Sequence, residues 1–158
     1  MEMQSRVTVG IRFHDLSRIQ LLERCLFSVA AQTDVEIDIC IAVQGVDCLG
    51  LRLIREVSVR ALANSFNATL EILDIPNPSR ADLRSKLLNH IVGFHYRLPH
   101  SRFLIFIDYD DIWFSHALST LVNSLTSGPF AMAYADVHAA DVAAMLHSPF
   151  STEECRLL

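Results

Sequence analysis

Short apolar runs alternate along the chain with segments in which apolar residues recur every three or four positions. The runs predict strands, and the helical spacing predicts helices between them. The predicted strands cover residues 7–11, 35–43, 69–73, 103–107 and 130–137. The predicted helices run from a cap at Ser17 to about Gln32, and over 51–65, 79–96 and 115–125. This regular alternation predicts an α/β fold of three layers, α/β/α, around a mostly parallel sheet.

The fourth apolar run ends abruptly in carboxylates. Phe103 to Ile107 predicts a strand buried on both faces, and Asp108, Asp110 and Asp111 follow it directly. Ligands of open α/β sheets bind at the carboxyl edge of the strands. Crowded carboxylates there favour a hard divalent cation as a partner. The alternative is that Asp110 and Asp111 only begin the next helix, where aspartate is a favoured cap.

Composition narrows the class of protein. The 158 residues indicate a single domain, and 51% hydrophobic residues with a mean hydropathy of +0.31 indicate a surface that something normally covers. A net charge of -5 argues against a nucleic-acid partner. No signal peptide or membrane-spanning run is visible, which predicts a cytoplasmic protein. Peripheral contact with the cytoplasmic face of a membrane, and contact between copies of the chain, both stay open.

The cysteines favour the same compartment. The chain contains no Cys-x-x-Cys pair and no spacing of cysteine with histidine that is typical of metal ligands. Cys25 and Cys40 fall within apolar elements, so we expect them to be small buried thiols. This usage indicates a reducing environment and no disulfide framework.

Several motifs in order resemble the inverting glycosyltransferases of family 2, which have the GT-A fold. The similar stretches are 7–15, 26–33 (Leu-x-Ser-Val-x-x-Gln-Thr), 88–91, 106–121 (Phe-Ile-Asp-x-Asp-Asp and its trailing helix) and 133–137. The resemblance implies a nucleotide-sugar-binding domain over 1–138. Residues 139–158 are then a tail or the start of an acceptor-binding part. It also implies a nucleotide-diphosphate sugar as donor and a saccharide, lipid or protein as acceptor.

The resemblance gives the acidic residues separate roles. It implies that Asp108 lies beside the nucleotide ribose and that Asp110 holds Mg²⁺ or Mn²⁺ against the diphosphate of the donor. A divalent ion at that place stabilises the negative charge that builds on the leaving group. We interpret Asp111 as a helix cap in preference to an outer hydrogen-bond acceptor.

Basic residues at two other places match positions near the nucleotide in the family. Arg12 and His14 stand in the turn after the first strand, where the resemblance implies nucleotide contacts. Arg80 and Arg84 open the helix before the acidic strand, where a guanidinium would contact the phosphates. For the first pair the alternative is a solvated loop, and for the second it is an ordinary charged helical face.

The sequence departs from the family at two points. Its second strand ends in Val43-Gln44-Gly45-Val46, where the family has Asp-Asp-Gly-Ser. Gln44 offers an amide oxygen to a nucleobase but carries no charge, which leaves the nucleotide open. The family's general base lies in a later segment, and no residue here is identifiable as that base. Glu153 and Glu154 are better interpreted as part of a tail. His138, after the fifth predicted strand, is the one other histidine that merits a test.

Three functions remain. The first is a glycosyltransferase, and the second is a non-catalytic module with the same fold that binds a nucleotide or a partner chain. The third is a phosphatase-like enzyme with Asp108 as nucleophile and Asp110 as acid. That class normally carries its motif after the first strand, whereas here the motif follows the fourth, so the third function is disfavoured.

Overall fold

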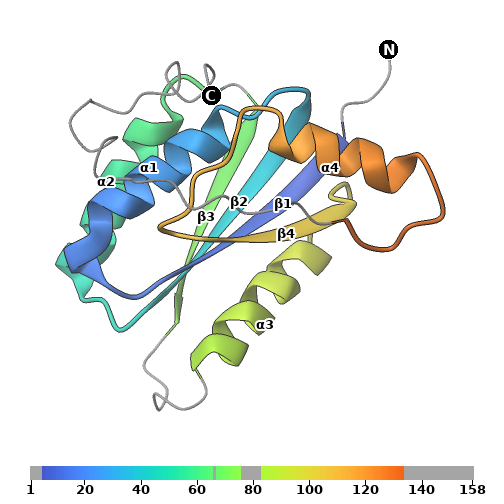
Figure 1. Ribbon diagram of the computed structural model, residues 1–158. Helices are drawn as coiled ribbons and strands as arrows, with labels where there is room; N and C mark the ends of the chain where they lie inside the picture. Colours follow the sequence, from blue (N-terminus) through green and yellow to red (C-terminus); the bar gives the residue numbers. More distant parts are fainter. Residues whose placement is uncertain (1–4, 66, 76–82, 134–158) are drawn as a thin grey trace.

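The computed structural model describes residues 5–65, 67–75 and 83–133 of the chain. Its four strands form one parallel sheet in the order β3-β2-β1-β4 (Figure 1). The strands are β1 (Ser5–Phe13), β2 (Val35–Gln44), β3 (Ala68–Ile75) and β4 (Phe103–Asp108). The helices are α1 (Ile19–Ala30), α2 (Cys48–Leu62), α3 (Leu83–Tyr96) and α4 (Ala117–Thr126), with a short 3₁₀ turn, η1 (Leu16–Arg18), before α1.

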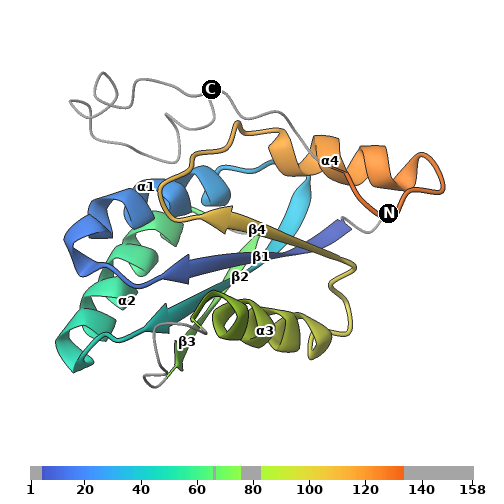
Figure 2. The ribbon, with the colours of Figure 1, turned by 60° about the horizontal axis from the view of Figure 1, so that its bottom comes forward.

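Helices cover both faces of this sheet. Helices α1 and α2 pack together on one face, and α3 packs against β1 and β2 on the other (Figures 1 and 2). The predicted α/β class, with a parallel sheet between helical layers, is therefore confirmed. Within the described ranges, no helix is both long enough and apolar enough to cross a membrane.

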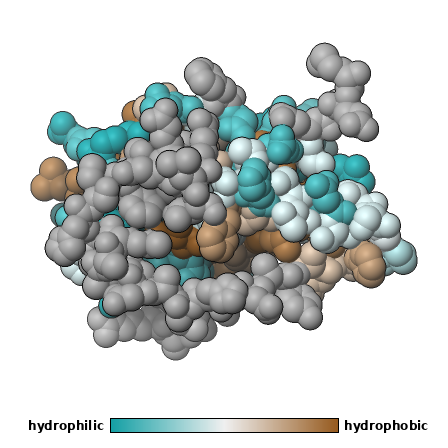
Figure 3. All heavy atoms as spheres, turned by 45° about the horizontal axis from the view of Figure 1, so that its top comes forward, coloured by the Kyte–Doolittle hydropathy of each residue, from teal (hydrophilic) through white to brown (hydrophobic). Residues whose placement is uncertain are grey.

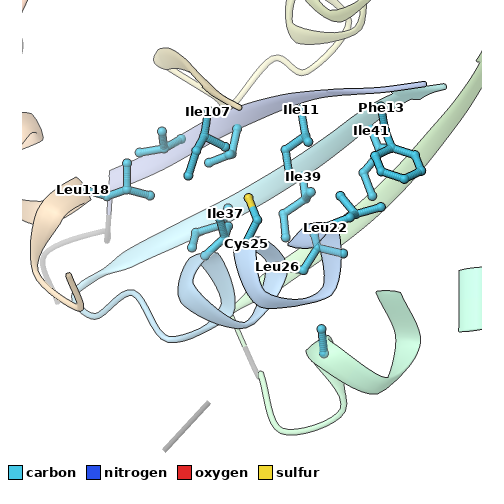
Figure 4. Packing of buried hydrophobic residues seen from close by; sticks show 14 of the residues in the cluster. Ile11, Phe13, Leu22, Cys25, Leu26, Ile37, Ile39, Ile41, Ile107 and Leu118 are labelled. Atoms are coloured by element: carbon cyan, nitrogen blue, oxygen red, sulfur yellow. The ribbon is translucent and has the colours of Figure 1, made fainter. Parts of the chain in front are cut away.

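Alternate residues of β2 face two cores, and β1 contributes to the larger one. The larger core lies between the sheet and α1, and Figure 4 shows its side chains converging there. It includes Ile11, Phe13, Leu22, Cys25, Leu26, Ile37, Ile39 and Ile41. The smaller core joins Cys40 and Ala42 to α3 through Leu87 and Ile91. Because side chains alternate between the faces of a strand, Arg12 and Gln44 share the α3 face with this smaller core. The expectation that Cys25 and Cys40 are buried free thiols is confirmed.

The fourth strand differs from its prediction. In the described sheet β4 pairs with β1 alone and is the last strand in the order. Ile107 is the one buried residue of β4, and Phe106 is 43% exposed. The expectation that this run is buried on both faces is thus wrong for the described part of the chain. The physical reason is that α3 packs mainly against β1 and β2. Leu104 of β4 still packs against the core under α3, while Phe106 stays partly exposed.

Two helix starts also differ from the sequence prediction. Ser17 does not cap the first helix. Asp15 instead caps η1, accepting hydrogen bonds from the Ser17 backbone nitrogen at 3.0 Å and from its Oγ at 2.6 Å. Asp47 caps α2 by accepting from the Gly50 nitrogen at 2.8 Å, so that helix begins before the predicted start at residue 51. Of the predicted fifth strand, 130–133 are not in a strand and 134–137 lie outside the described residues.

Candidate functional site

Arg12 and Asp108 meet at the carboxyl edge of the sheet. The parallel register of β1 and β4 pairs these two residues, so their side chains leave the same face side by side. The Arg12 Nη2 donates to the Asp108 Oδ1 at 2.7 Å. The Asp108 side chain is 58% exposed and the Arg12 side chain is 22% exposed. The two predicted nucleotide-site residues therefore form one charged pair that opens to solvent.

Tyr109 joins the turns that follow β1 and β4. Its ring packs edge-on against Phe13, with ring centroids 5.2 Å apart, and against His14 at 6.0 Å. His14 is exposed, so this contact places the imidazole beside the acidic segment. The sequence reasoning missed Tyr109. Its only signal was the aromatic type of the residue between the two aspartates.

Arg18 brings a second guanidinium to the acidic segment. It is the last residue of η1, and its Nη1 donates to the Tyr109 hydroxyl at 3.4 Å. The same nitrogen lies 3.9 Å from the Asp110 Oδ2, and its Nε lies 3.6 Å from the Asp15 Oδ2. Sequence reasoning missed Arg18 as well, since nothing in the local pattern showed that η1 turns back toward β4.

Asp111 does not cap a helix. Residues 111–114 are in neither a helix nor a strand, and α4 begins at Ala117 without a side-chain cap. The Asp111 nitrogen instead closes a turn by donating to the Asp108 carbonyl at 3.0 Å. Burial raises the pKa of Asp111 above its ordinary value, and the charges of Asp110 and Asp108 raise it further. The interpretation of Asp111 as a cap is therefore wrong, and its carboxyl stays within the acidic cluster.

The helical motif at 26–33 anchors the loop that carries these aspartates. The Ser28 Oγ accepts from the Trp113 nitrogen at 3.2 Å. The buried Gln32 donates through Nε2 to the Phe114 carbonyl at 2.7 Å and accepts from the Leu118 nitrogen at 2.9 Å. These hydrogen bonds anchor the loop after Asp111 to α1 and Gln32, and the residues directly after Asp111 do not begin a helix. They give a physical reason for a serine and a glutamine at these two positions.

Gln44 lies at the end of β2 with a buried, unpartnered acceptor. The residue is 4% exposed, and no described residue donates a hydrogen bond to its Oε1. A buried acceptor without a donor costs about 1–3 kcal/mol. Native structures usually satisfy such atoms, and an exception points to a strained site, a water or a ligand. An N–H or O–H donor, from a water or a ligand, would satisfy the Gln44 Oε1.

The remaining predicted residues lie partly or wholly outside the described part of the chain. The backbone of Arg84 is in the first turn of α3, and its side chain is outside the described set. Arg80, His138, Glu153 and Glu154 lie outside the described residues altogether. Arg12, His14, Asp108 and Asp110 are the predicted residues that the structure brings together.

Asp110 is the residue that the sequence predicts as a metal ligand. Among the described residues there is no group of three histidine, cysteine, aspartate or glutamate side chains placed to hold a metal ion. The described residues therefore form no closed cage for a metal ion at this edge. Magnesium, however, is commonly bound through one or two carboxylates together with substrate phosphates. A site of that kind needs only one or two carboxylates from the protein, and the Asp110 side chain is exposed at this edge.

Sequence comparison identifies no relative. No protein-family model matches the chain, and no curated protein sequence matches it. Solved structures do show a similar fold. A crystal structure of S. aureus TarS aligns with a TM-score of 0.55 at 14% identity, covering 77% of this chain and 20% of that one. A structure of TarS residues 1–349 gives 0.53 at 17% identity, covering 77% and 31%.

These comparisons establish a fold. The chain has a glycosyltransferase-like α/β fold, and it spans between a fifth and a third of the TarS chains that it matches. A fold hosts many functions, so the reaction has to be argued from the residues at the strand edge.

Proposed function

We propose that this chain binds a nucleoside diphosphate sugar and takes part in metal-assisted transfer of the sugar to an acceptor, as a glycosyltransferase similar to those of family 2. One observation carries the proposal. On a glycosyltransferase-like fold, Arg12, Asp108 and Asp110 gather at the carboxyl edge between β1 and β4. That edge is the general ligand position of parallel α/β sheets.

Each group has a distinct proposed task. Asp108 accepts hydrogen bonds from the ribose hydroxyls of the donor, and Arg12 contacts its phosphates. The exposed pair between Arg12 and Asp108 contributes only about 0–1 kcal/mol, so rearranging it on binding costs little. Gln44 accepts from the nucleobase, and the exposed His14 borders the entrance.

A divalent ion completes the proposed site. When bound, Mg²⁺ or Mn²⁺ supplies positive charge that stabilises the departing diphosphate. Asp110 would hold that ion together with the phosphates. Burial raises the pKa of Asp111, and the charges of Asp110 and Asp108 raise it further. A cation beside these carboxylates would relieve their mutual repulsion.

Titration calorimetry tests the proposal. UDP, GDP, CDP and ADP are titrated with and without Mn²⁺ into the chain and into Asp110→Asn. We expect at least one of them to bind more tightly with Mn²⁺, and Asp110→Asn to lose that gain. Asp34→Asn is the matched control, because Asp34 precedes β2 at the opposite edge and its φ of 63° suits asparagine. Absence of binding by all four nucleotides, or a Mn²⁺ gain that survives Asp110→Asn, would contradict the proposal.

The second candidate is a non-catalytic module that binds the same ligand. The neutral Gln44 and the ion-paired Asp108 favour it, because both groups suit recognition without requiring turnover. Release of free sugar from a bound donor, or its transfer to any acceptor, by the purified chain would exclude this candidate. Nucleotide binding without either reaction would support it.

A further inference from the structure

We infer that Arg18 is a phosphate-binding residue of this edge, and that it directs the site toward diphosphates over monophosphates. The inference rests on the proposed function and extends it to a residue outside the motifs that the chain shares with family 2. Its basis is the placement of the Arg18 guanidinium between Tyr109 and Asp110, at the end of a turn that Asp15 fixes.

The Arg18 guanidinium contacts a residue on each of its two sides, Asp15 and Tyr109. Asp15 is held by two hydrogen bonds from Ser17, at 3.0 and 2.6 Å, and its Oδ2 lies 3.6 Å from the Arg18 Nε. On the far side, the Arg18 Nη1 donates to the Tyr109 hydroxyl at 3.4 Å. Tyr109 is itself packed against Phe13. The guanidinium is therefore held near the strand edge while its side chain stays 53% exposed.

Arg18 differs from Arg12 in how it meets a carboxylate. Arg12 makes a direct bond of 2.7 Å to Asp108, whereas Arg18 stays 3.9 Å from Asp110 and 3.6 Å from Asp15. Both Arg18 distances exceed those of charge-assisted hydrogen bonds, which are about 2.7–2.9 Å. Within the described residues, Arg18 thus forms long ion pairs with Asp15 and Asp110 and no hydrogen bond with either carboxylate. A planar guanidinium in this state suits an incoming phosphate, which it contacts through two parallel N–H groups.

The negative charge at this edge requires cations if an anionic ligand is to bind. Asp108, Asp110 and Asp111 repel an anionic ligand, and Arg12 alone offsets one of the three. Arg18 supplies a second cation beside Asp110, where the proposed ion would bridge to the ligand. A diphosphate carries more charge and one more phosphate group than a monophosphate, so it gains more from a second cation at this edge. Removal of the Arg18 guanidinium should therefore weaken the binding of a nucleoside diphosphate more than that of the matching monophosphate.

The test compares ratios of affinities. UDP, GDP, CDP and ADP, each beside its monophosphate, are titrated into the chain, Arg18→Gln, Arg18→Lys and Arg52→Gln, with Mn²⁺ and with EDTA. For the nucleotide that binds best, Arg18→Gln should lose about tenfold in diphosphate affinity, with a smaller loss for the monophosphate. Arg18→Lys should recover part of the loss. Arg52→Gln is the matched control, since Arg52 is exposed on α2 and pairs with Glu56 there.

The outcomes separate the inference from the proposed function. If the unaltered chain binds no diphosphate, the proposed function fails and the inference fails with it. If the chain binds a diphosphate and Arg18→Gln leaves the ratio of diphosphate to monophosphate affinity unchanged, the inference alone is overturned. A lower melting temperature with an unchanged ratio would assign Arg18 to the stability of η1. Because the side chain is half exposed, we expect Arg18→Gln to fold.

Discussion

Arg12 and Asp108 are separated by 96 residues in the chain, yet they are register partners on neighbouring strands and their charged atoms lie 2.7 Å apart. This pair marks where the nucleotide is proposed to bind. It also makes a double-mutant cycle possible, because Asp108→Asn removes one charge with almost no change of shape and Arg12→Gln removes the other while keeping a polar side chain.

We expect Arg12→Gln and Asp108→Asn each to change the free energy of unfolding by less than about 1 kcal/mol, because the pair is exposed. Each should nonetheless weaken nucleoside diphosphate binding about tenfold, since each removes a charged partner of the ligand. Urea unfolding and calorimetry on the two single variants and the double variant measure both effects. A coupling in stability well above 1 kcal/mol, with unchanged binding, would make the pair structural.

Gln44→Met should stabilise the fold and weaken the binding of the nucleotide. The substitution keeps the side-chain volume but removes the buried acceptor, whose lack of a partner costs about 1–3 kcal/mol. We expect a gain of about 1 kcal/mol in urea unfolding and a loss of nucleotide affinity. Gln20→Met, on the exposed face of α1, is the control. If Gln44→Met destabilises the chain, its amide is satisfied in solution and has no acceptor to offer.

Gly10 and Gly93 should respond in opposite directions to the same change. A Cβ at Gly10 would lie 2.5 Å from the Ile91 Cγ2 and 3.0 Å from the Phe106 ring. Gly10→Ala should therefore cost about 1–3 kcal/mol by overpacking the contact of β1 with α3. A Cβ at Gly93 meets nothing within 4 Å, so Gly93→Ala should gain about 0.5–1 kcal/mol from helix propensity. Equal effects in thermal unfolding would contradict the packing of α3 against β1.

Asp38 should make stability depend on pH in the acid range. Burial by itself raises the pKa of this carboxyl, but hydrogen bonds from Arg6, at 2.6 and 2.7 Å, and from Thr69, at 2.6 Å, lower it more. The net pKa is below the unfolded value of about 3.9. The unfolded chain therefore takes up the proton first. The stabilisation is complete above the unfolded pKa and is lost as pH falls through the folded pKa.

The free energy of unfolding, measured from neutral pH into this acid window, checks that sign. Asp38→Asn should be less stable at neutral pH by about 1–3 kcal/mol, because it removes a charged partner of Arg6. Its stability should then fall less steeply with acid than that of the unaltered chain. Asp74→Asn, exposed on β3, is the matched control and should keep the original slope. If the stability of Asp38→Asn and of the control falls equally steeply with acid, Asp38 does not cause the pH dependence.

Much of the fold is written in local patterns. The alternation of apolar runs with helical spacing predicted all four described strands and the helices between them, because burial on a sheet and on a helix imposes different periods on the sequence. The order of these elements also placed Arg12, His14, Asp108 and Asp110 at one edge, since parallel strands end together.

Only the tertiary structure decided what these residues touch. Aspartate favours helix starts, yet Asp111 is no cap, because Ser28 and Gln32 anchor the following loop and α4 begins only at Ala117. Arg18 and Tyr109 carry no local signal of their meeting, which depends on how η1 turns after β1. Sequence periodicity records which side of an element is buried. Strand register and loop anchoring act between distant segments, and they determine which charges become neighbours.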